Sequence, residues 1–116
     1  MISSVSILGV PFSITYHDAL SDVDSGGQIP LRGQVDLQTS SIRVHKSNNL
    51  PAMFGIVVHE CIHALARELE LGFQNCEEDV TRVARGVTAL LLDNKLVDLE
   101  AIFRKETGEY PDEVDL

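Results

Sequence analysis

The chain has 116 residues, of which 44% are hydrophobic, and its formal net charge is −9. This length suits one domain with a modest core, and the apolar fraction argues against a disordered chain. The acidic charge argues against binding to nucleic acid or to anionic membranes, because no basic patch could meet their phosphates. No stretch is apolar enough to span a bilayer and residues 1–10 lack the basic charge of a signal peptide, so we expect a cytoplasmic protein.

The first 47 residues are predicted to form a sheet of three strands, antiparallel or mixed. A first strand covers about residues 5–16 and bends near Gly9, where glycine and proline interrupt the apolar pattern. A glycine- and serine-rich loop follows over 21–30. Two more strands, joined by a tight polar turn, are expected within 33–46, because apolar and polar residues alternate there.

The second half of the chain is predicted to be helical. A motif helix covers residues 51–71, since Pro51 suits a first helical position, Gly72 suits a stop, and apolar residues recur at three- and four-residue steps. A second helix is expected over 76–94. The segment 95–116 is expected to combine a short helix with an irregular acidic tail. The whole chain is therefore predicted to be a single α+β domain.

The motif helix carries the sequence His-Glu-Cys-Ile-His over residues 59–63. Residues four apart lie on one face of a helix, so His59 and His63 can direct two imidazoles to one point. Two imidazoles at this spacing suit a zinc ion, and Glu60 is placed to act on a metal-bound water. The alternative is a helix with two core histidines bonded to backbone groups. The zinc interpretation is favoured, because a metal ion would satisfy histidine and glutamate side chains that are costly to bury in an apolar helix.

A catalytic zinc ion keeps three protein ligands and one water, so a third ligand must come from another segment. Glu77, Glu78 and Asp79 lie just downstream. Helical geometry aligns Glu77 with the apolar stripe of the second helix, whereas Glu78 falls on the solvent side with Thr81 and Arg85. A carboxylate on a core-facing stripe needs a partner, which favours Glu77 as the third ligand. An acid stabilised by the helix dipole is the alternative explanation of Glu77, and His17 is a weaker rival for the ligand position.

These features together resemble the compact gluzincins, small zinc peptidases that include the minigluzincins and of which many come from phages and prophages. The resemblance covers nearly the whole chain: a strand and hairpin half, the His59–His63 helix, a short loop, and the helix that begins at Glu77. It implies a zincin-like fold in which His59, His63 and Glu77 bind Zn²⁺ and Glu60 is the general base. The loop before Glu77 is shorter than in large gluzincins such as thermolysin, and no third histidine follows as in metzincins.

The resemblance implies a zinc-dependent peptidase that acts on a peptide or protein substrate. Glu60 would take a proton from the attacking water and pass it to the leaving amine. A second oxyanion donor could be Tyr16, His17 or Tyr110, and an exposed sheet edge near the helix could hold an extended peptide. The alternatives are a silent or latent zinc-binding regulatory protein, with residues 107–116 filling the cleft, and a peptidase that cleaves repressors of phages or mobile elements. Glu60 favours an enzyme, because a purely structural zinc site has no use for a base.

Overall fold

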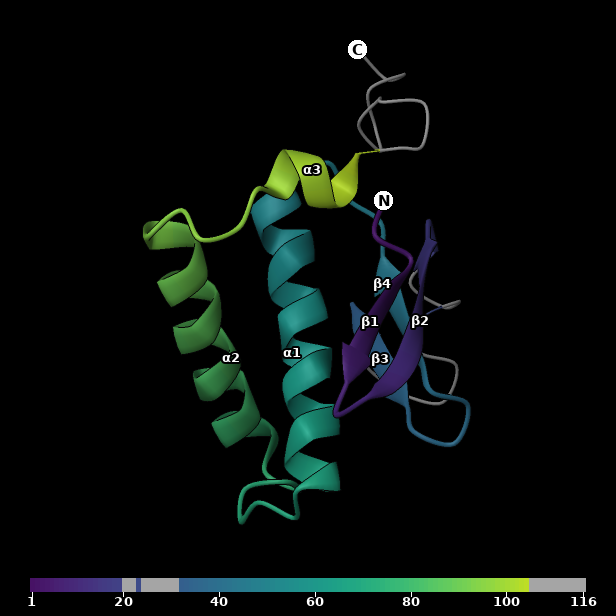
Figure 1. Cartoon of the computed structure of the whole chain (residues 1–116), viewed down its shortest axis with the longest axis vertical. Coiled ribbons are helices and arrows are strands. Elements are labelled where there is room, and N and C mark those ends of the chain that lie inside the picture. Colours follow the sequence, from purple (N-terminus) through teal and green to yellow (C-terminus); the bar gives the residue numbers. More distant parts are fainter. Residues whose placement is uncertain (20–22, 24–31, 105–116) are drawn as a thin grey trace.

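In the part of the chain that the structure describes, four strands form a mixed sheet and three helices follow it (Figure 1). The computed structural model describes residues 1–19, 23 and 32–104. Its elements are β1 (Ser4–Ile7), β2 (Val10–His17), β3 (Gly33–Asp36), β4 (Ser41–His45), α1 (Leu50–Glu68), α2 (Glu77–Asp93) and α3 (Leu99–Phe103). The predicted α+β class is confirmed. The expected loop over 21–30, apart from Val23, and the expected acidic tail lie outside the described residues.

The expected bend near Gly9 is a complete hairpin, so the described sheet has four strands where three were predicted. Leu8 and Gly9 adopt φ angles of 52° and 83°, which are the positive values that a two-residue type I′ turn requires at both central positions. The strands on either side, β1 and β2, pair antiparallel. Pro11 is tolerated in β2 because the pairing of β2 with β4 begins only at Ser13, beyond the missing N–H group.

The strand order β1-β2-β4-β3 leaves β3 at an edge of the sheet. Strands β2 and β4 run parallel, and β3 runs antiparallel to β4. The N–H of His45 in β4 donates to the carbonyl of Arg32 at 2.7 Å. With the observed register, this bond shows that every second residue from Arg32 onward is hydrogen-bonded to β4. Because hydrogen-bonded positions alternate along an antiparallel pair, the backbone groups of Gly33 and Val35 turn away from β4. They face the edge of β3 that pairs with no other described strand, which is called the free edge below.

Helix α1 lies between the sheet and α2, so different layers cover its two sides (Figure 1). On the sheet side the core includes Ile42, Val44 and Met53, which are all fully buried. Helix α2 packs on the other side through Val80 and Ala84. This stacking brings the central turns of α1 between the edge strand β3 and the first turns of α2.

Helix α1 begins and ends close to the predicted positions. The side chain of Asn49 caps its start by accepting a hydrogen bond from the N–H of Ala52 at 3.1 Å. The helix ends at Glu68, before the expected stop at Gly72. The stop is instead made by Glu70, which adopts a left-handed φ of 52° and closes a Schellman motif. The bounds of α2 agree with the predicted helix to within one residue at each end.

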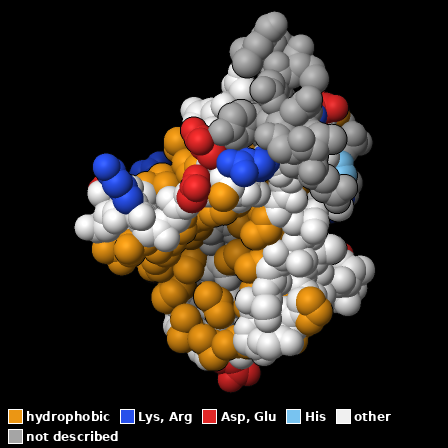
Figure 2. Space-filling view, turned by 45° about the horizontal axis from the view of Figure 1, so that its top comes forward, with side chains coloured by type: hydrophobic (Ala, Val, Ile, Leu, Met, Phe, Trp, Pro, Cys, Tyr) orange, Lys and Arg blue, Asp and Glu red, His pale blue; other side chains and the backbone are white. Residues whose placement is uncertain are grey.

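One face of the molecule gathers hydrophobic side chains around a hollow, with few charged side chains between them (Figure 2). Among the described residues, the large hydrophobic side chains that stay exposed are those of Leu8, Val10, Leu69, Val83, Leu90 and Leu96. A small domain has too little polar surface to cover itself, so this exposure alone assigns no role to the face. None of the described helices combines the length and the apolar character that crossing a membrane requires.

Candidate metal centre

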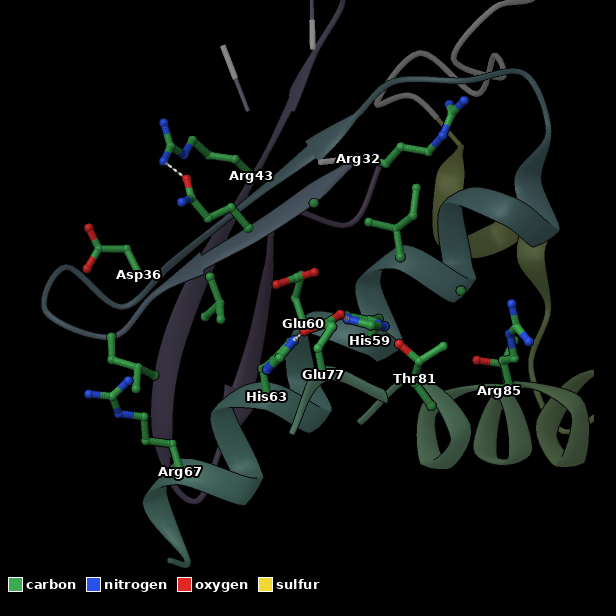
Figure 3. A pocket seen from close by; sticks show the side chains of 18 of the residues that line it. Arg32, Asp36, Arg43, His59, Glu60, His63, Arg67, Glu77, Thr81 and Arg85 are labelled. Atoms are coloured by element: carbon green, nitrogen blue, oxygen red, sulfur yellow. Dashed lines mark hydrogen bonds and ion pairs between the residues drawn. The ribbon is translucent and has the colours of Figure 1, made fainter. Parts of the chain in front are cut away.

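The side chains of His59, His63 and Glu77 point toward one another in a cleft between β3, α1 and α2 (Figure 3). The two histidines stand on successive turns of α1, and Glu77 is the first residue of α2. The connection between the helices reverses the chain, so the start of α2 lies beside these turns of α1. The cleft has a volume of about 970 Å³ and extends along α1 on both sides of the three residues.

The Glu77 carboxylate lies between the two imidazole rings. Its Oε1 is 2.7 Å from Nε2 of His59, and its Oε2 is 2.7 Å from Nε2 of His63. The ring centroids are 4.8 Å apart, with the ring planes inclined at 62°. Among the described residues these three form the one group of His, Cys, Asp and Glu side chains whose ligand atoms, all within 4.8 Å of one another, could hold a metal ion.

The donor set of this group fits a divalent transition metal. Zinc binds imidazole nitrogen and carboxylate oxygen at about 2.0–2.2 Å, and tetrahedral geometry then separates neighbouring ligand atoms by about 3.3 Å. The 2.7 Å contacts would therefore open by about 0.6 Å when a metal ion binds, and the ligand atoms that lie up to 4.8 Å apart would move closer together. The side chain of Glu77 has room for this movement, because it is 66% exposed and lines the cleft. Its neighbours on the same helix face, Val80 and Ala84, are buried as the apolar stripe predicted.

Glu60 is buried beside the metal-ligand group, with a relative exposure of 6%. Burial, and secondly the negative charge of Glu77, raise the pKa of its carboxyl group to about 7. The backbone N–H of Val35 donates a hydrogen bond to this carboxyl group and partly opposes the shift. Glu60 is thus held between α1 and the free edge of β3. A carboxyl group with this pKa can both accept and release a proton near neutral pH.

Gly33 allows the edge strand to approach Glu60 this closely. A Cβ atom at position 33 would lie 2.4 Å from Cγ2 of Ile56 and 3.1 Å from Oε2 of Glu60. Any other residue would therefore push β3 away from α1 or displace the carboxyl group. The sequence shows this glycine only as the start of a strand, and the reason for it becomes clear from the packing of β3 on α1.

Gly33→Ala is expected to destabilise the protein by about 1–3 kcal/mol, because the added methyl group overpacks the contact with Ile56. Gly86→Ala is the matched control. Gly86 lies within α2 with open space around it, so alanine there should stabilise the protein by about 0.5–1 kcal/mol. Urea denaturation of both variants measures the two opposite signs. Equal effects, or a neutral Gly33→Ala, would contradict the close packing of β3 on α1.

The cleft wall formed by α2 contains residues that the sequence pattern assigned to solvent. Thr81 and Arg85 line the cleft, one and two turns after Glu77 (Figure 3). Glu78 does face away, and pairs with Arg82 at 2.8 Å. Thr81 and Arg85 line the cleft because the face of α2 that carries Glu77 is wider than the row of residues that packs on α1. The spacing of four and eight residues from Glu77 is the signal that could have identified them.

Tyr16 and His17, two further residues considered from the sequence, do not reach the site. The Tyr16 hydroxyl donates to the carbonyl of Ile2 at 2.7 Å, and His17 bonds a neighbouring threonine hydroxyl at 2.8 Å. Neither residue belongs to the described lining of the cleft. His17 is therefore not the third member of the group, and Tyr110 lies outside the described residues. Burial, with the charge of Glu60 second, raises the pKa of Cys61 to about 11, so this thiol stays protonated.

Comparisons with protein-family models, with curated proteins and with solved structures each found no match. The resemblance to compact gluzincins thus remains a hypothesis from the sequence. The structure itself shows an α+β fold and a His₂Glu group that could hold a metal ion.

Proposed function

We propose that this protein is a zinc-dependent peptidase. The observation that carries the proposal is the convergence of His59, His63 and Glu77 in an open cleft, next to the buried carboxyl group of Glu60. Structural zinc sites are mostly rich in cysteine and use all four coordination positions, whereas catalytic sites use three protein ligands and leave one position open. Two histidines and one glutamate are a donor set of the catalytic kind.

Bound to these three residues, zinc would activate a water molecule and polarise the scissile carbonyl group. Glu60 is then the residue that moves the proton, accepting it from the attacking water and donating it to the leaving amine. Burial raises the pKa of this carboxyl group to about 7 in the metal-free protein, and a bound cation would lower it, which favours the ionised form that accepts the proton. The N–H of Val35 donates a hydrogen bond to this carboxyl group and so restrains its position.

The free edge of β3 gives the substrate a place to bind. The backbone groups of Gly33 and Val35 face this edge, and an extended peptide can add to such an edge as a further strand. The N–H of Val35 already bonds Glu60, so the peptide would use the groups of Gly33 and the carbonyl of Val35. A strand added there would lie along the cleft beside the metal-ligand group.

A zinc-binding regulatory protein without catalysis is the second candidate. The burial of Glu60 speaks against it, because an ionisable group with 6% exposure costs stability unless it has a task. The latent form, in which residues 107–116 would fill the cleft, concerns residues outside those described.

Elemental analysis followed by a cleavage assay tests the proposal. We expect about one zinc ion per chain in the wild type and in Glu60→Gln, since Glu60 is not a ligand. The zinc-loaded wild type should cleave members of a mixed peptide pool, detected by mass spectrometry, and Glu60→Gln should not. Zinc binding with no cleavage beyond that of Glu60→Gln would favour the regulatory protein, and no zinc binding would refute both candidates.

A further inference from the structure

Arginines gather in the cleft of a strongly acidic protein. The chain has nine Lys and Arg residues and eighteen Asp and Glu residues. Four of the basic residues line the cleft, namely Arg32, Arg43, Arg67 and Arg85. Of the acidic residues in the described part of the chain, three line it, namely Asp36, Glu60 and Glu77. Among the described residues that line the cleft, arginines therefore outnumber acids by four to three, whereas acids outnumber bases by two to one in the whole sequence.

The three acids of the cleft already have partners or roles. Glu77 belongs to the metal-ligand group, and Glu60 is the proposed base. The Asp36 carboxylate accepts hydrogen bonds from the N–H groups of Gln38 and Thr39, at 2.9 and 3.3 Å, and so stabilises the turn after β3. None of the three lies within ion-pair distance of Arg32, Arg67 or Arg85.

The arginines stand at both ends of the cleft (Figure 3). Arg85 on α2 and Arg32 at the start of β3 lie at the end next to His59. Both arginines lie at this end because β3 contacts α1 at Ile56, and α2 contacts α1 at the neighbouring residue Gly55 through Thr88. Arg67, one turn after His63 on α1, lies at the opposite end. A peptide in the cleft would pass arginines on both sides of the metal-ligand group.

Helix α2 offers a direct comparison between two arginines. Arg82 faces away from the cleft and pairs with Glu78 at 2.8 Å and with Asp79 at 3.4 Å. Arg85, almost one turn further, faces the cleft, and no carboxylate of the described residues lies within ion-pair distance of it. The chain has twice as many acidic as basic residues, so a shortage of acidic residues does not explain why no described carboxylate lies near Arg85.

We infer that the cleft selects peptides carrying carboxylates close to the scissile bond, which Arg85 and Arg32 bind on one side of the metal-ligand group and Arg67 on the other. This inference rests on the proposed peptidase function, from which it takes the assumption that the ligand is a peptide. Guanidinium groups bond carboxylates through two parallel N–H donors, which gives the selection its geometry. The acidic remainder of the protein repels such peptides only weakly, because charges beyond a Debye length of about 8 Å are screened at physiological salt.

Peptide binding to the zinc-loaded Glu60→Gln protein tests this inference without requiring catalysis. The probes are fluorescent pools of peptides of about ten residues with amidated C-termini, carrying Glu in one pool and Gln at the same positions in the other. A third pool, with Gln and a free C-terminal carboxylate, separates a terminal carboxylate from an acidic side chain as the group recognised. Fluorescence anisotropy measures each affinity, with and without Arg85→Gln or the matched control Arg82→Gln.

We expect the Glu pool, the free-carboxylate pool or both to bind about tenfold more tightly than the amidated Gln pool at physiological salt. Arg85→Gln should remove most of this preference, Arg82→Gln should preserve it, and high salt should reduce it. Equal binding of all pools, tighter binding of the amidated Gln pool, or equal effects of the two arginine substitutions would overturn the inference. If the preference is found but the zinc-loaded wild type leaves the bound peptides intact, the peptidase proposal fails while the selection of carboxylates stands.

Discussion

Zinc is expected to raise the melting temperature of the wild-type protein by about 15 °C and to change that of Glu77→Ala far less. A ligand that binds only the folded state stabilises it by about 4 kcal/mol when present at a thousand times its Kd. For a domain of this size, each kcal/mol corresponds to about 4 °C. Alanine removes one of three ligand atoms and the negative charge that attracts the cation. Calorimetry of metal-free protein, with and without zinc, measures both shifts.

Glu78→Ala is the matched control, because Glu78 is the next residue of α2 and pairs with Arg82 outside the cleft. It should retain the full zinc-dependent shift, and a chelator should reverse that shift. Calcium should stabilise the wild type little, since calcium prefers six to eight oxygen ligands over two imidazoles. Equal zinc shifts in wild type and Glu77→Ala would mean that the ion binds elsewhere or without the α2 carboxylate.

The sequence predicted both the α+β fold and the three residues, His59, His63 and Glu77, that form a group able to hold a metal ion. His59 and His63 follow from a spacing of four on one helix, which is a local geometric rule. Glu77 could be selected from three neighbouring acids because helix periodicity aligns it with Val80 and Ala84. In each case the argument needed only positions along one element. That the Glu77 helix packs beside the motif helix was expected from the family resemblance rather than from the residues.

The missed features depend on turns and on contacts between layers. The sequence did not predict the turn between β1 and β2, because the first central position of this turn is occupied by Leu8, and leucine rarely adopts a positive φ. The role of Gly33 depends on where β3 meets Ile56, which lies far away in sequence. The position of Arg85 in the cleft depends on how much of the α2 face the motif helix leaves uncovered. Each of these is a property of packing, which periodicity does not encode.

Metal-free Glu60→Gln is expected to be about 3 kcal/mol more stable than wild type at pH 8 and equally stable near pH 4. The pKa of Glu60 is about 7 in the folded protein, against 4.5 without burial. Below the lower value the carboxyl group is protonated in both states and costs nothing. As the pH rises toward 7 the unfolded chain ionises first, so the wild type loses stability, at about 1.4 kcal/mol per pKa unit. Glutamine keeps the acceptor for the N–H of Val35 and does not titrate.

Urea denaturation in the presence of a chelator, at several pH values, measures this difference. Glu68→Gln, at the exposed end of the same helix, should leave the pH dependence unchanged. Zinc should narrow the gap between wild type and Glu60→Gln, because a nearby cation stabilises the ionised carboxylate. Equal stability of the two proteins at pH 8 would mean that water reaches Glu60 and that its pKa is ordinary. A measured gap would instead show that the fold accepts a loss of stability to keep a proton acceptor in the cleft, as a catalytic base requires and a structural zinc site does not.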